Sequence, residues 1–516
     1  MTRERLAAAG VGAVAGVLAM LVTTIALLGL RMLVGIPLPL ELISDRFIPM
    51  LPVDTFLRFV GLVGGFVAGK RIGFISFFLG QVGLGAFLGA LYGLVVARAP
   101  ARRLPLLAAA ALGAWAVTIL VLWPTLDSSY RGLPPGWAHV VTALGLLLAL
   151  GLFAASLAAF HSYATRPAAP RAALGREPHL SRRAVVLGGA GAALGIAAGG
   201  LATTLYRRSA IPYDGLETRA AEVDPITPND RFYVVTKNFV DPRVDRSLWR
   251  LEVKGLVERP RMYGFDELVE LESVEQETTL ECISNGIGAG LISNARWTGV
   301  PLARLLEAAG VRDGAAHVFA RGVDGYGHGF ALEKALEPTT LVVYRMNGEP
   351  LPDRHGYPAR LIVPGSYGEV SVKWIDRVAV LAEPEEGFYE LQGWRAERVH
   401  TMSRIDRPLG RRSRRVGRPT LVNGVAFAGG RGIKRVELST DGGRSWKETR
   451  LDYRGSRLSW ALWSLDWTPE RAGRHELVVR ATDGDGELQT AERGGIAPDG
   501  ATGFHRVTVS VVAPGA

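Results

Sequence analysis

Residues 279–302 have the sequence TLECISNGIGAGLISNARWTGVPL and contain Cys282, the only cysteine of the chain. The cysteine follows a short stretch with β-strand character, 276–281, and precedes a glycine-rich loop with little side-chain bulk. A free cysteine is commonly a small buried apolar residue. Its thiolate is also a soft metal ligand and a nucleophile, so a strand-end thiol beside an open loop predicts a metal ligand or a covalent catalyst. All three interpretations of Cys282 are open at this point.

Several short motifs follow the cysteine loop in order. They are NARWTGVPL (294–302), MNGEPL (346–351), HGYPAR (355–360), PG (364–365) and SVKW (371–374). Together they resemble the molybdenum-cofactor domain of the sulfite oxidase family, and the resemblance covers about 280 residues, 232–511. It implies an α+β domain that binds molybdopterin in its mononucleotide form, with Cys282 as metal ligand and catalytic residue. The metal is molybdenum, or tungsten as an open alternative, and the cofactor carries the redox chemistry.

The resemblance also implies which residues bind the pterin. Arginine offers a planar fork to the cofactor's phosphate, lysine a point charge, and serine and backbone N–H groups further donors. The candidate cofactor-binding residues are Lys237, Asn238, Asn285, Asp324, His355, Arg360, Ser371, Val372 and Lys373. Taken singly, Lys237 also fits a solvated charge at a strand end, and Asp324 also fits a plain turn residue. Tyr326, Tyr367 and Tyr389 lie near the motifs, and the sequence does not decide which of them is a proton donor.

The sequence departs from the family where sulfite-oxidising members bind their substrate. Lys237, Asn238 and Phe239 stand where many of those members have arginine, asparagine and histidine. Gly286 and Ile287 replace the arginines that usually follow the cysteine and build the sulfate pocket. Sulfite is therefore disfavoured, and the expectation is oxygen-atom transfer on another small substrate.

The chain has room for two to four domains, with 516 residues, 48% of them hydrophobic. Its apolar residues are concentrated in the first 206 positions, and apolar runs of about 20 residues are typical of membrane-spanning helices. Five spans are predicted, at residues 7–30, 72–97, 104–123, 139–160 and 184–206. A short apolar piece, 56–68, is separated from the second span by Lys70 and Arg71 and is not counted as a span. Residues 31–54 carry acidic side chains and are predicted to form an external loop.

The basic residues predict the orientation of these spans. The net charge is +10, but the basic residues largely lie between hydrophobic segments, which indicates membrane topology and no nucleic-acid partner. With a cytoplasmic N-terminus, the basic loops 97–103 and 161–183 are both cytoplasmic, and everything after Tyr206 lies outside. The segment LSRRAVVL, 180–187, resembles a twin-arginine export signal. The expected location is a bacterial cell membrane, with a multi-pass anchor and an extracytoplasmic catalytic domain.

The rest of the chain is expected to form a linker and two further domains. Residues 207–230 are the linker, 231–403 the molybdopterin domain, and 404–516 a domain that resembles the immunoglobulin-like β-sandwich of this family, through which members form homodimers. Alternating apolar residues and turn residues predict individual elements. The predicted strands are 232–238, 249–253, 316–320, 340–344, 435–440 and 475–481, and the predicted helix is 301–310.

The resulting expectation is a membrane-anchored molybdopterin oxidoreductase that exchanges electrons with a separate carrier, such as a cytochrome or a quinone-linked protein. One cysteine excludes cysteine-ligated iron–sulfur clusters and thioether-linked haem within this chain, and no haem or flavin motif is visible. Two alternatives remain. The cofactor domain also resembles the methionine-sulfoxide reductases of the same superfamily, which work in the opposite direction. A non-enzymatic, membrane-tethered β-sandwich module, with Cys282 as a core residue, is the second.

Overall fold

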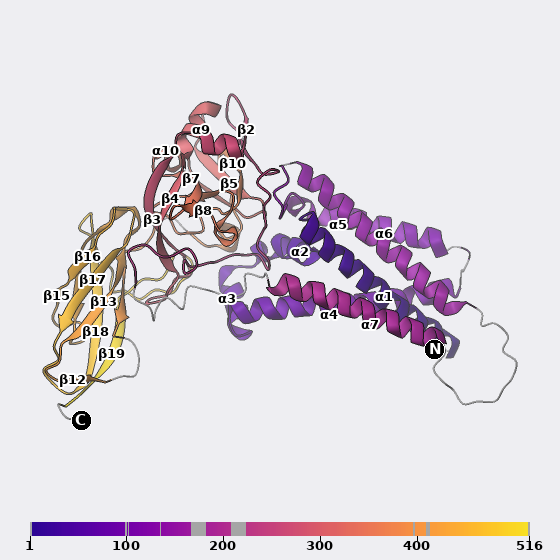
Figure 1. Ribbon diagram of the computed structural model, residues 1–516, viewed down its shortest axis with the longest axis horizontal. Coiled ribbons are helices and arrows are strands. Elements are labelled where there is room, and N and C mark those ends of the chain that lie inside the picture. The colour runs from indigo at the N-terminus through magenta and orange to yellow at the C-terminus, as the bar shows by residue number, and fades with distance from the viewer. Residues whose placement is uncertain are drawn as a thin grey trace. The chain divides into compact units, whose positions relative to one another are not determined.

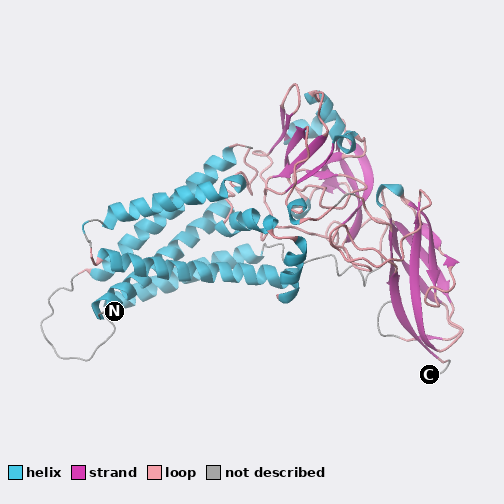
Figure 2. Cartoon of the chain, turned by 180° about the vertical axis from the view of Figure 1, so that it is seen from behind, coloured by secondary structure: helices cyan, strands magenta, loops and turns pink. Residues whose placement is uncertain are grey.

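The computed structural model describes residues 3–98, 101, 103–134, 136–166, 182–207, 223–395, 398–408 and 413–513. It divides into two compact units, which Figure 1 shows as ribbons. The first consists of Met1–Phe47, Val60–Ile211 and Asn238–Arg243, and the second of Ile48–Phe59, Pro212–Lys237 and Val244–Ala516. The first unit is helical and the second is built mainly of strands (Figure 2). Leu180 and Ser181 of the predicted export signal and most of the predicted linker lie outside the described residues.

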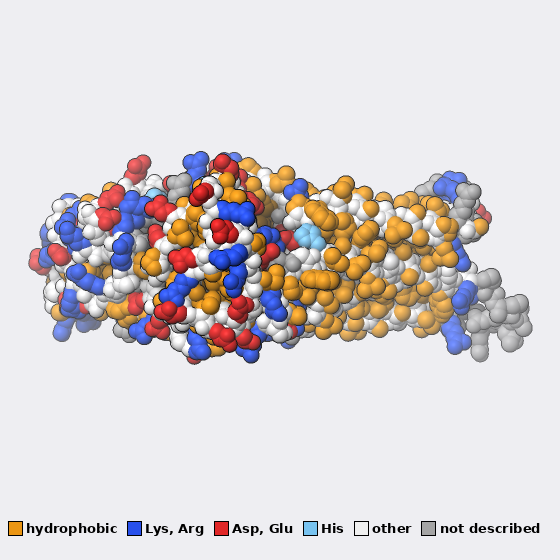
Figure 3. Space-filling view, turned by 90° about the horizontal axis from the view of Figure 1, so that it is seen from above, with side chains coloured by type: hydrophobic (Ala, Val, Ile, Leu, Met, Phe, Trp, Pro, Cys, Tyr) orange, Lys and Arg blue, Asp and Glu red, His pale blue; other side chains and the backbone are white. Residues whose placement is uncertain are grey.

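The helical unit contains five helices that are long and apolar enough to cross a membrane, judged by length and composition. They are α1 (Arg3–Leu33), α4 (Phe66–Val96), α5 (Arg103–Leu122, continued by the 3-10 turn η3, Trp123–Thr125), α6 (Trp137–Thr165) and α7 (Arg182–Arg207). Hydrophobic side chains cover most of the face of this unit seen in Figure 3. Each predicted span largely coincides with one of these helices; α1, α6 and α7 extend beyond both predicted bounds, and α4 and α5 begin earlier than predicted but end one residue before the predicted bound.

Two expectations about the segments before α4 are wrong. Lys70 and Arg71 do not divide the apolar sequence but lie inside α4, where the Lys70 ammonium donates to the carbonyl of Asn238 at 3.0 Å. Residues 31–54 are not a loop, because they contain the end of α1, helix α2 (Pro39–Phe47), the 3-10 turn η1 (Ile48–Met50) and the start of α3 (Val53–Leu62). The charge of Glu41 on α2 is paired inside the unit, since it bonds the buried Arg31 guanidinium at 3.0 Å.

Glycines allow α1 and α4 to approach each other closely. A Cβ atom at Gly89 would overlap the carbonyl oxygen of Gly12 and lie 2.7 Å from Cα of Gly16. Gly16 and Gly85 face each other in the same way. Such backbone-to-backbone contact is the usual way in which small residues bring apolar helices together.

We expect Gly89→Ala to destabilise the helical unit by about 1–3 kcal/mol, because the added methyl group has no free space to occupy. The measurement is the thermal unfolding of the full chain in detergent. Gly113→Ala on α5 is the matched control, since a Cβ there meets nothing within 4 Å. Equal melting temperatures for the two variants would show that α1 and α4 are not in close contact.

The cofactor domain of the second unit is built on two sheets. One has the order β2-β1-β10-β5-β6, and the other has the order β3-β4-β7-β8 with β9 paired to β7. The strands of the first sheet are β2 (Arg261–Gly264), β1 (Arg250–Gly255), β10 (Ile375–Leu381), β5 (His317–Gly322) and β6 (Gly327–Ala331). Those of the second are β3 (Val274–Glu281), β4 (Ile292–Pro301), β7 (Leu341–Met346), β8 (Glu349–Pro350) and β9 (Arg360–Ile362). The short helices are α8 (Phe265–Glu270), α9 (Leu302–Ala309) and α10 (Leu332–Leu336).

Most of the elements predicted in this domain are confirmed. The predicted helix corresponds to α9, which ends at Gly310 in the left-handed conformation (φ 71°) that favours glycine. The strand prediction for residues 232–238 is wrong. Side chains from elsewhere in the domain satisfy its backbone groups in place of a neighbouring strand: Ser293 Oγ accepts from the Tyr233 N–H, and the Lys373 ammonium donates to the Val235 carbonyl.

The C-terminal domain is a sandwich of two sheets with the orders β11-β13-β17-β16 and β12-β19-β18-β14-β15. Its strands are β11 (Met402–Arg407), β12 (Arg414–Arg415), β13 (Thr420–Phe427), β14 (Ile433–Ser439), β15 (Lys447–Glu448), β16 (Arg450–Tyr453), β17 (Ala461–Trp467), β18 (Gly473–Asp483) and β19 (His505–Val512). Side chains of both sheets, among them Val422, Leu438 and Trp463, form one apolar core. The two predicted strands here, now β14 and β18, are confirmed.

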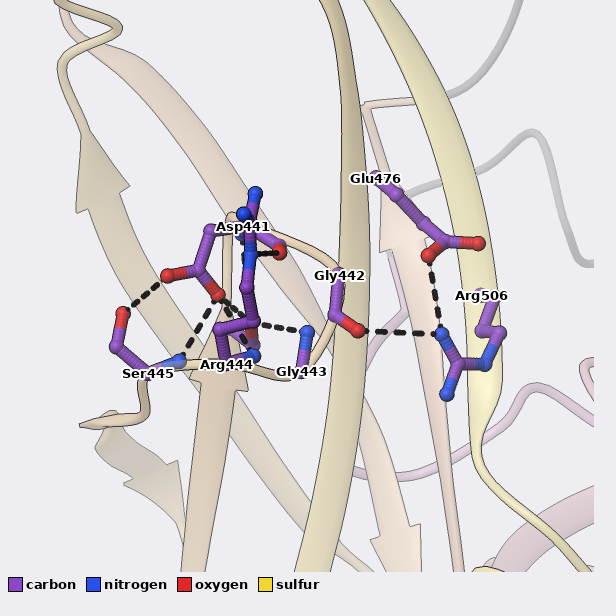
Figure 4. Close-up of polar contacts among 8 residues, drawn as sticks. Asp441, Gly442, Gly443, Arg444, Ser445, Glu476 and Arg506 are labelled. Atoms are coloured by element: carbon purple, nitrogen blue, oxygen red, sulfur yellow. Dashed lines mark hydrogen bonds and ion pairs between the residues drawn. The ribbon is translucent and has the colours of Figure 1, made fainter.

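The turn after β14 is held by the side chain of Asp441 (Figure 4). Its carboxylate accepts from the backbone N–H groups of Arg444 and Ser445, at 3.0 and 2.9 Å, and from the hydroxyl of Ser445 at 2.6 Å. These hydrogen bonds lower the pKa of Asp441 below its ordinary value. On the neighbouring strands, Arg506 pairs with Glu476 at 3.0 Å and donates to the carbonyl of Gly442. The turn at Asp441, Gly442 and Gly443 is thus a locally stabilised structure.

Strand β3, which leads to Cys282, is also bonded to the C-terminal domain. The Thr279 N–H donates to the carbonyl of Leu458 at 3.1 Å, and its hydroxyl accepts from the Trp460 N–H at 2.9 Å. The Tyr453 hydroxyl donates to the Glu277 carboxylate at 2.6 Å. The sandwich therefore supports the edge of the sheet that carries the cysteine.

Candidate active site

Cys282 lies directly after β3, with its side chain buried. Its backbone N–H donates to the carbonyl of Leu291 at 3.0 Å, and its Sγ is 3.1 Å from the hydroxyl of Ser284. Burial raises the pKa of the thiol to about 11, and the carboxyls of Glu369 and Glu281 add to the shift. The thiol is therefore protonated at neutral pH unless a cation binds it, and metal binding would displace the proton.

Asn285 and Glu281 shape the loop around the cysteine. The Asn285 amide oxygen accepts from the Leu291 N–H at 2.9 Å, and its amide nitrogen donates to Glu281 Oε1 at 2.8 Å. The predicted cofactor-binding residue Asn285 thus lies beside Cys282, with both of its amide atoms used within the loop. Burial raises the pKa of Glu281 to about 7, and its Oε2 has no hydrogen-bond partner among the described residues.

Arg360, which is buried, and Lys373, which is half-buried, form a cationic cluster. The Arg360 guanidinium donates to the carbonyls of His355 and Ser371, at 3.2 and 3.0 Å. Lys373 donates to the carbonyls of Arg354 and Val235, at 3.1 and 3.2 Å. Within the described part of the chain, Arg360 has no carboxylate within ion-pair distance, and its Nε has no acceptor. A buried guanidinium without a counter-ion needs an anion, because an uncompensated buried charge is costly.

This cluster fits the phosphate end of a molybdopterin, and the rest of the donor set fits the metal end. Among the residues that the structure describes, no group of three or more His, Cys, Asp or Glu side chains is placed to hold a metal ion. A metal at Cys282 would thus take fewer than three ligands from these side chains, which matches a cofactor that supplies the others. The residues present are therefore compatible with the cofactor that the sequence predicts.

His355 shows how positive this region is. Its Nε2 lies 3.0 Å from the carbonyl of Asn229, so the neutral ring donates there. Burial lowers the pKa of His355 to about 3, and the charges of Arg360, Lys373 and Arg354 contribute to the shift. A neutral histidine among cations is the environment expected beside a bound phosphate.

We expect His355 to make the cofactor-free protein acid-sensitive. The pKa of His355 in the native state lies below the ordinary value of about 6.5. Between these two values the unfolded state binds a proton and the native state does not. The free energy of unfolding therefore falls as the pH drops from about 6.5 towards 3. Relative to His355→Gln, the cofactor-free wild type should lose about 1.4 kcal/mol of unfolding free energy per pH unit in this range.

The measurement for His355 is urea unfolding at pH 6.5 and 4.5, followed through tryptophan fluorescence. The cofactor-loaded wild type should lose less than the cofactor-free form, because a bound phosphate favours the charged ring. Parallel pH profiles of the cofactor-free wild type and the variant would contradict a neutral native His355.

The remaining predicted residues fall into three groups. Lys237 donates to the backbone carbonyl of Asp324 at 3.0 Å, so these two candidates lie together. Ser371 and Val372 adjoin Arg360, but the Ser371 hydroxyl accepts from the Val363 N–H and the Val372 N–H bonds within its own loop. Asn238 is assigned to the helical unit, where its Oδ1 accepts from the Tyr130 hydroxyl at 3.3 Å.

Sequence reasoning missed several buried groups beside Cys282. The Tyr233 hydroxyl lies so close to Gly368 that a side chain there would overlap it. Burial raises the pKa of Tyr233 well above its ordinary value, and the Cys282 thiol adds to this. Glu369 and His328 come from a loop and from β6, far from the cysteine in sequence. Glu281 could have been found from the sequence, because it is next to Cys282. Tyr233, Glu369 and His328 are distant from Cys282 in sequence, so only the fold shows that they belong to this region.

Comparison with known proteins now identifies the family. A model of the oxidoreductase molybdopterin binding domain matches residues 238–389, and a model of the Mo-co oxidoreductase dimerisation domain matches residues 405–511. Mitochondrial sulfite oxidase from Homo sapiens is 32% identical over 310 residues, which are 50% of this chain and 56% of that protein. This chain belongs to the sulfite oxidase family of molybdenum-cofactor oxidoreductases.

Other members of the sulfite oxidase family show how far the likeness extends. An NADH nitrate reductase from Solanum lycopersicum is 30% identical over 322 residues, which are 50% of this chain and 35% of that protein. The crystal structure of the sulfane dehydrogenase SoxCD from Paracoccus pantotrophus is 28% identical with a TM-score of 0.53, covering 57% of this chain and 83% of that chain. This chain spans 35% to 56% of the length of the two curated relatives. The predicted resemblance and the β-rich dimerisation domain are confirmed.

Proposed function

We propose that this protein is a membrane-anchored molybdopterin oxidoreductase that transfers an oxygen atom to or from a small substrate and exchanges electrons with a separate carrier. The observation that carries the proposal is the buried Arg360, which has no counter-ion among the described residues and lies in the same domain as the lone Cys282. When bound, the cofactor would supply two-electron oxygen-atom chemistry at its metal. The chain's own residues would bind it, orient it and handle protons.

We assign the cofactor contacts as follows. Cys282 would hold the metal, and Arg360, Lys373 and His355, with Ser371 and Val372 beside them, would surround the phosphate. Lys237 and Asp324 would contact the pterin, and Asn285 would position the cysteine loop. The described hydrogen bonds of Asn238 are to Lys70 and Tyr130 of the helical unit, and its contact with the cofactor stays a prediction.

The groups around Cys282 favour a substrate with little negative charge. Burial is the main cause of the raised pKa values of Cys282 and Tyr233, and the carboxyls of Glu281 and Glu369 add to both shifts. Gly286 and Ile287 offer no positive charge. A neutral sulfur compound or its S-oxide fits better than sulfite. The raised pKa values of Glu281 and Glu369 also support the alternative direction, sulfoxide reduction, because carboxyls that take up protons more readily can supply a reaction that consumes them.

The helical unit supports the proposed location. Five helices of sufficient length and apolarity, with basic loops at 97–103 and 161–183, fit an anchor with an extracytoplasmic catalytic domain in a bacterial cell membrane. The match of residues 405–511 to a dimerisation domain supports a homodimer through this β-sandwich. The sandwich itself would have an immunoglobulin-like fold. A cytochrome or a quinone-linked protein would serve as the carrier.

Elemental analysis of the purified full chain, produced in a cofactor-competent host, tests this function. We expect about one molybdenum or tungsten and one pterin per chain. Two assays then decide the direction: reduction of ferricyanide with sulfite or thiosulfate, and oxidation of reduced viologen with methionine sulfoxide. A chain free of metal and pterin would support the non-enzymatic tethered module instead.

A further inference from the structure

We propose that His328, together with Glu369 and Glu390, forms a proton relay between the Cys282 site and the protein surface. The inference rests on the proposed function, because oxygen-atom transfer moves protons as well as electrons. When a substrate is oxidised, the oxygen of one water is added to it, two electrons leave to the external carrier, and two protons must leave the buried site. In the reducing direction, two protons and two electrons enter and one water is formed.

The central observation is a pair of buried polar atoms that face each other. His328 Nε2 and Glu369 Oε1 are 3.8 Å apart, and the two side chains are 4% and 5% exposed. Neither atom has a hydrogen-bond partner in the described parts of the chain. At 3.8 Å the two atoms are not hydrogen-bonded. A movement of less than about 1 Å would bring them into hydrogen-bond distance, which suits a transient proton transfer better than a permanent structural bond.

The inner end of the relay lies beside the cysteine. The Gly368 N–H donates to the carbonyl of Glu281 at 2.7 Å, which fixes the loop with Glu369 against the end of β3. The Tyr326 hydroxyl donates to the Glu369 carbonyl at 2.9 Å and holds this loop from the other side. The Glu369 carboxyl is close enough to Cys282 to raise the pKa of its thiol.

The outer end is Glu390, whose side chain is 24% exposed. Its Oε2 is 3.7 Å from Nδ1 of His328 and accepts from the Gly387 N–H at 2.7 Å. The loop that carries Glu390 lies directly against β6, because a Cβ on Gly387 would overlap the carbonyl oxygen of Gly327. Glu390 is therefore the member of the trio that can exchange protons with water.

His328 is suited to pass a proton between the two carboxyls. Its Nδ1 is 2.7 Å from the carbonyl of Gly329, so the neutral ring carries its proton there and presents Nε2 as an acceptor towards Glu369. Burial lowers the pKa of His328, but the carboxyls of Glu369 and Glu390 outweigh this, and the net shift is upward from 6.5. Burial raises the pKa of Glu369, which His328 partly opposes. The pKa of each group is therefore raised above its ordinary value, which favours uptake of a proton by either one.

Other titratable groups face this trio. Tyr326 is affected by Glu369, Tyr389, Glu390 and Asp324, all of which raise its pKa beyond the effect of burial. Glu369 also acts on Tyr233 and Tyr367. All of the tyrosines that show a shift here have raised pKa values and remain protonated at neutral pH. The tyrosines therefore do not compete with His328 and Glu369 for the transferred proton.

The first experiment measures turnover and metal content of the full-length holoenzyme in detergent. His328→Gln and Glu390→Gln are assayed between pH 5 and 9 with methionine sulfoxide plus reduced viologen and with thiosulfate plus ferricyanide. We expect normal metal and pterin content but turnover slower by about 100-fold in His328→Gln, the lower range for a lost proton-transfer group, and a changed pH profile in Glu390→Gln. Exogenous imidazole should partly restore His328→Ala. Glu383→Gln, at an exposed position without a described partner, is the control.

Wild-type rates and pH profiles in both His328→Gln and Glu390→Gln would overturn the relay. The second experiment needs no turnover. Histidine-selective NMR of the full chain, with the His328 signal assigned by its loss in His328→Gln, should show a pKa above 6.5 that falls in Glu369→Gln and in Glu390→Gln. The relay is also overturned if the measured pKa of His328 is 6.5 or lower and does not change in Glu369→Gln or in Glu390→Gln. An inactive, metal-free wild type would instead contradict the proposed function, while the NMR result still decides whether the trio is coupled.

Discussion

Replacing Cys282 by serine is expected to abolish turnover while the pterin and the fold remain. The cysteine is the proposed protein ligand to the metal, and no group of three metal-binding side chains occurs among the described residues to replace it. Loss of groups that merely orient a metal ligand commonly costs about 10–100-fold in activity, so loss of the ligand itself should exceed about 100-fold. The cationic cluster at Arg360 and Lys373 is untouched by the substitution and should retain the pterin.

Absorption spectroscopy of Cys282→Ser checks this directly, because a thiolate-to-metal charge-transfer band should disappear together with activity. Ser284→Ala is the matched control: it removes the hydroxyl 3.1 Å from Sγ but leaves the ligand, so the band should persist. An active, spectrally unchanged Cys282→Ser protein would return Cys282 to the role of a buried apolar residue.

Replacing Arg360 by lysine is expected to cause the second-largest effect, loss of the cofactor. Lysine preserves the charge but lacks the planar guanidinium group. In the wild type, two nitrogens of that group donate to the carbonyls of His355 and Ser371, and Nε has no acceptor and can donate to a bound anion. The loss of one or two charge-assisted hydrogen bonds, each worth about 1.5–3 kcal/mol, should weaken cofactor retention by about 100-fold. The measurement is pterin and metal per chain after dialysis.

Arg345→Lys is the control for Arg360→Lys. Arg345 lies on β7 with an exposed side chain and a single described contact to the Gly348 carbonyl. Thermal unfolding separates the two effects of the Arg360 substitution, since cofactor loss without a lower melting temperature of the cofactor-free protein isolates binding from folding. Full retention of pterin by Arg360→Lys would show that the unpaired guanidinium does not bind the phosphate.

The sequence predicted those parts of the fold that depend on local patterns. Apolar runs of sufficient length gave five helices, and the leucines before Gly310 gave α9. The strand predicted at residues 232–238 from its apolar pattern is absent. The same pattern also fits an extended segment whose backbone groups are hydrogen-bonded by side chains, such as that of Ser293. Lys70 inside α4 was missed because its partner, Asn238, lies 168 positions away.

The candidate site divides in the same way. Cys282, Arg360 and Lys373 were predictable because short motifs mark them, and the family match supports the assignment of the domain. Asn238 came from the family pattern alone, and its described hydrogen bonds lie in the helical unit. Glu369 and His328 meet only through the packing of a loop against β6, so no spacing along the chain could have paired them.

The hydrogen bonds between β3 and the sandwich limit how this protein can be dissected or recombined. A fragment ending at residue 395 would lose the Leu458, Trp460 and Tyr453 partners of the strand that leads to Cys282. Exchanging the C-terminal domain with that of a relative would require a matching Glu277 and Thr279 as well. The proposed metal ligand therefore depends on hydrogen bonds that reach the domain matched to dimerisation, and a fragment that is to preserve the cysteine's surroundings needs both domains.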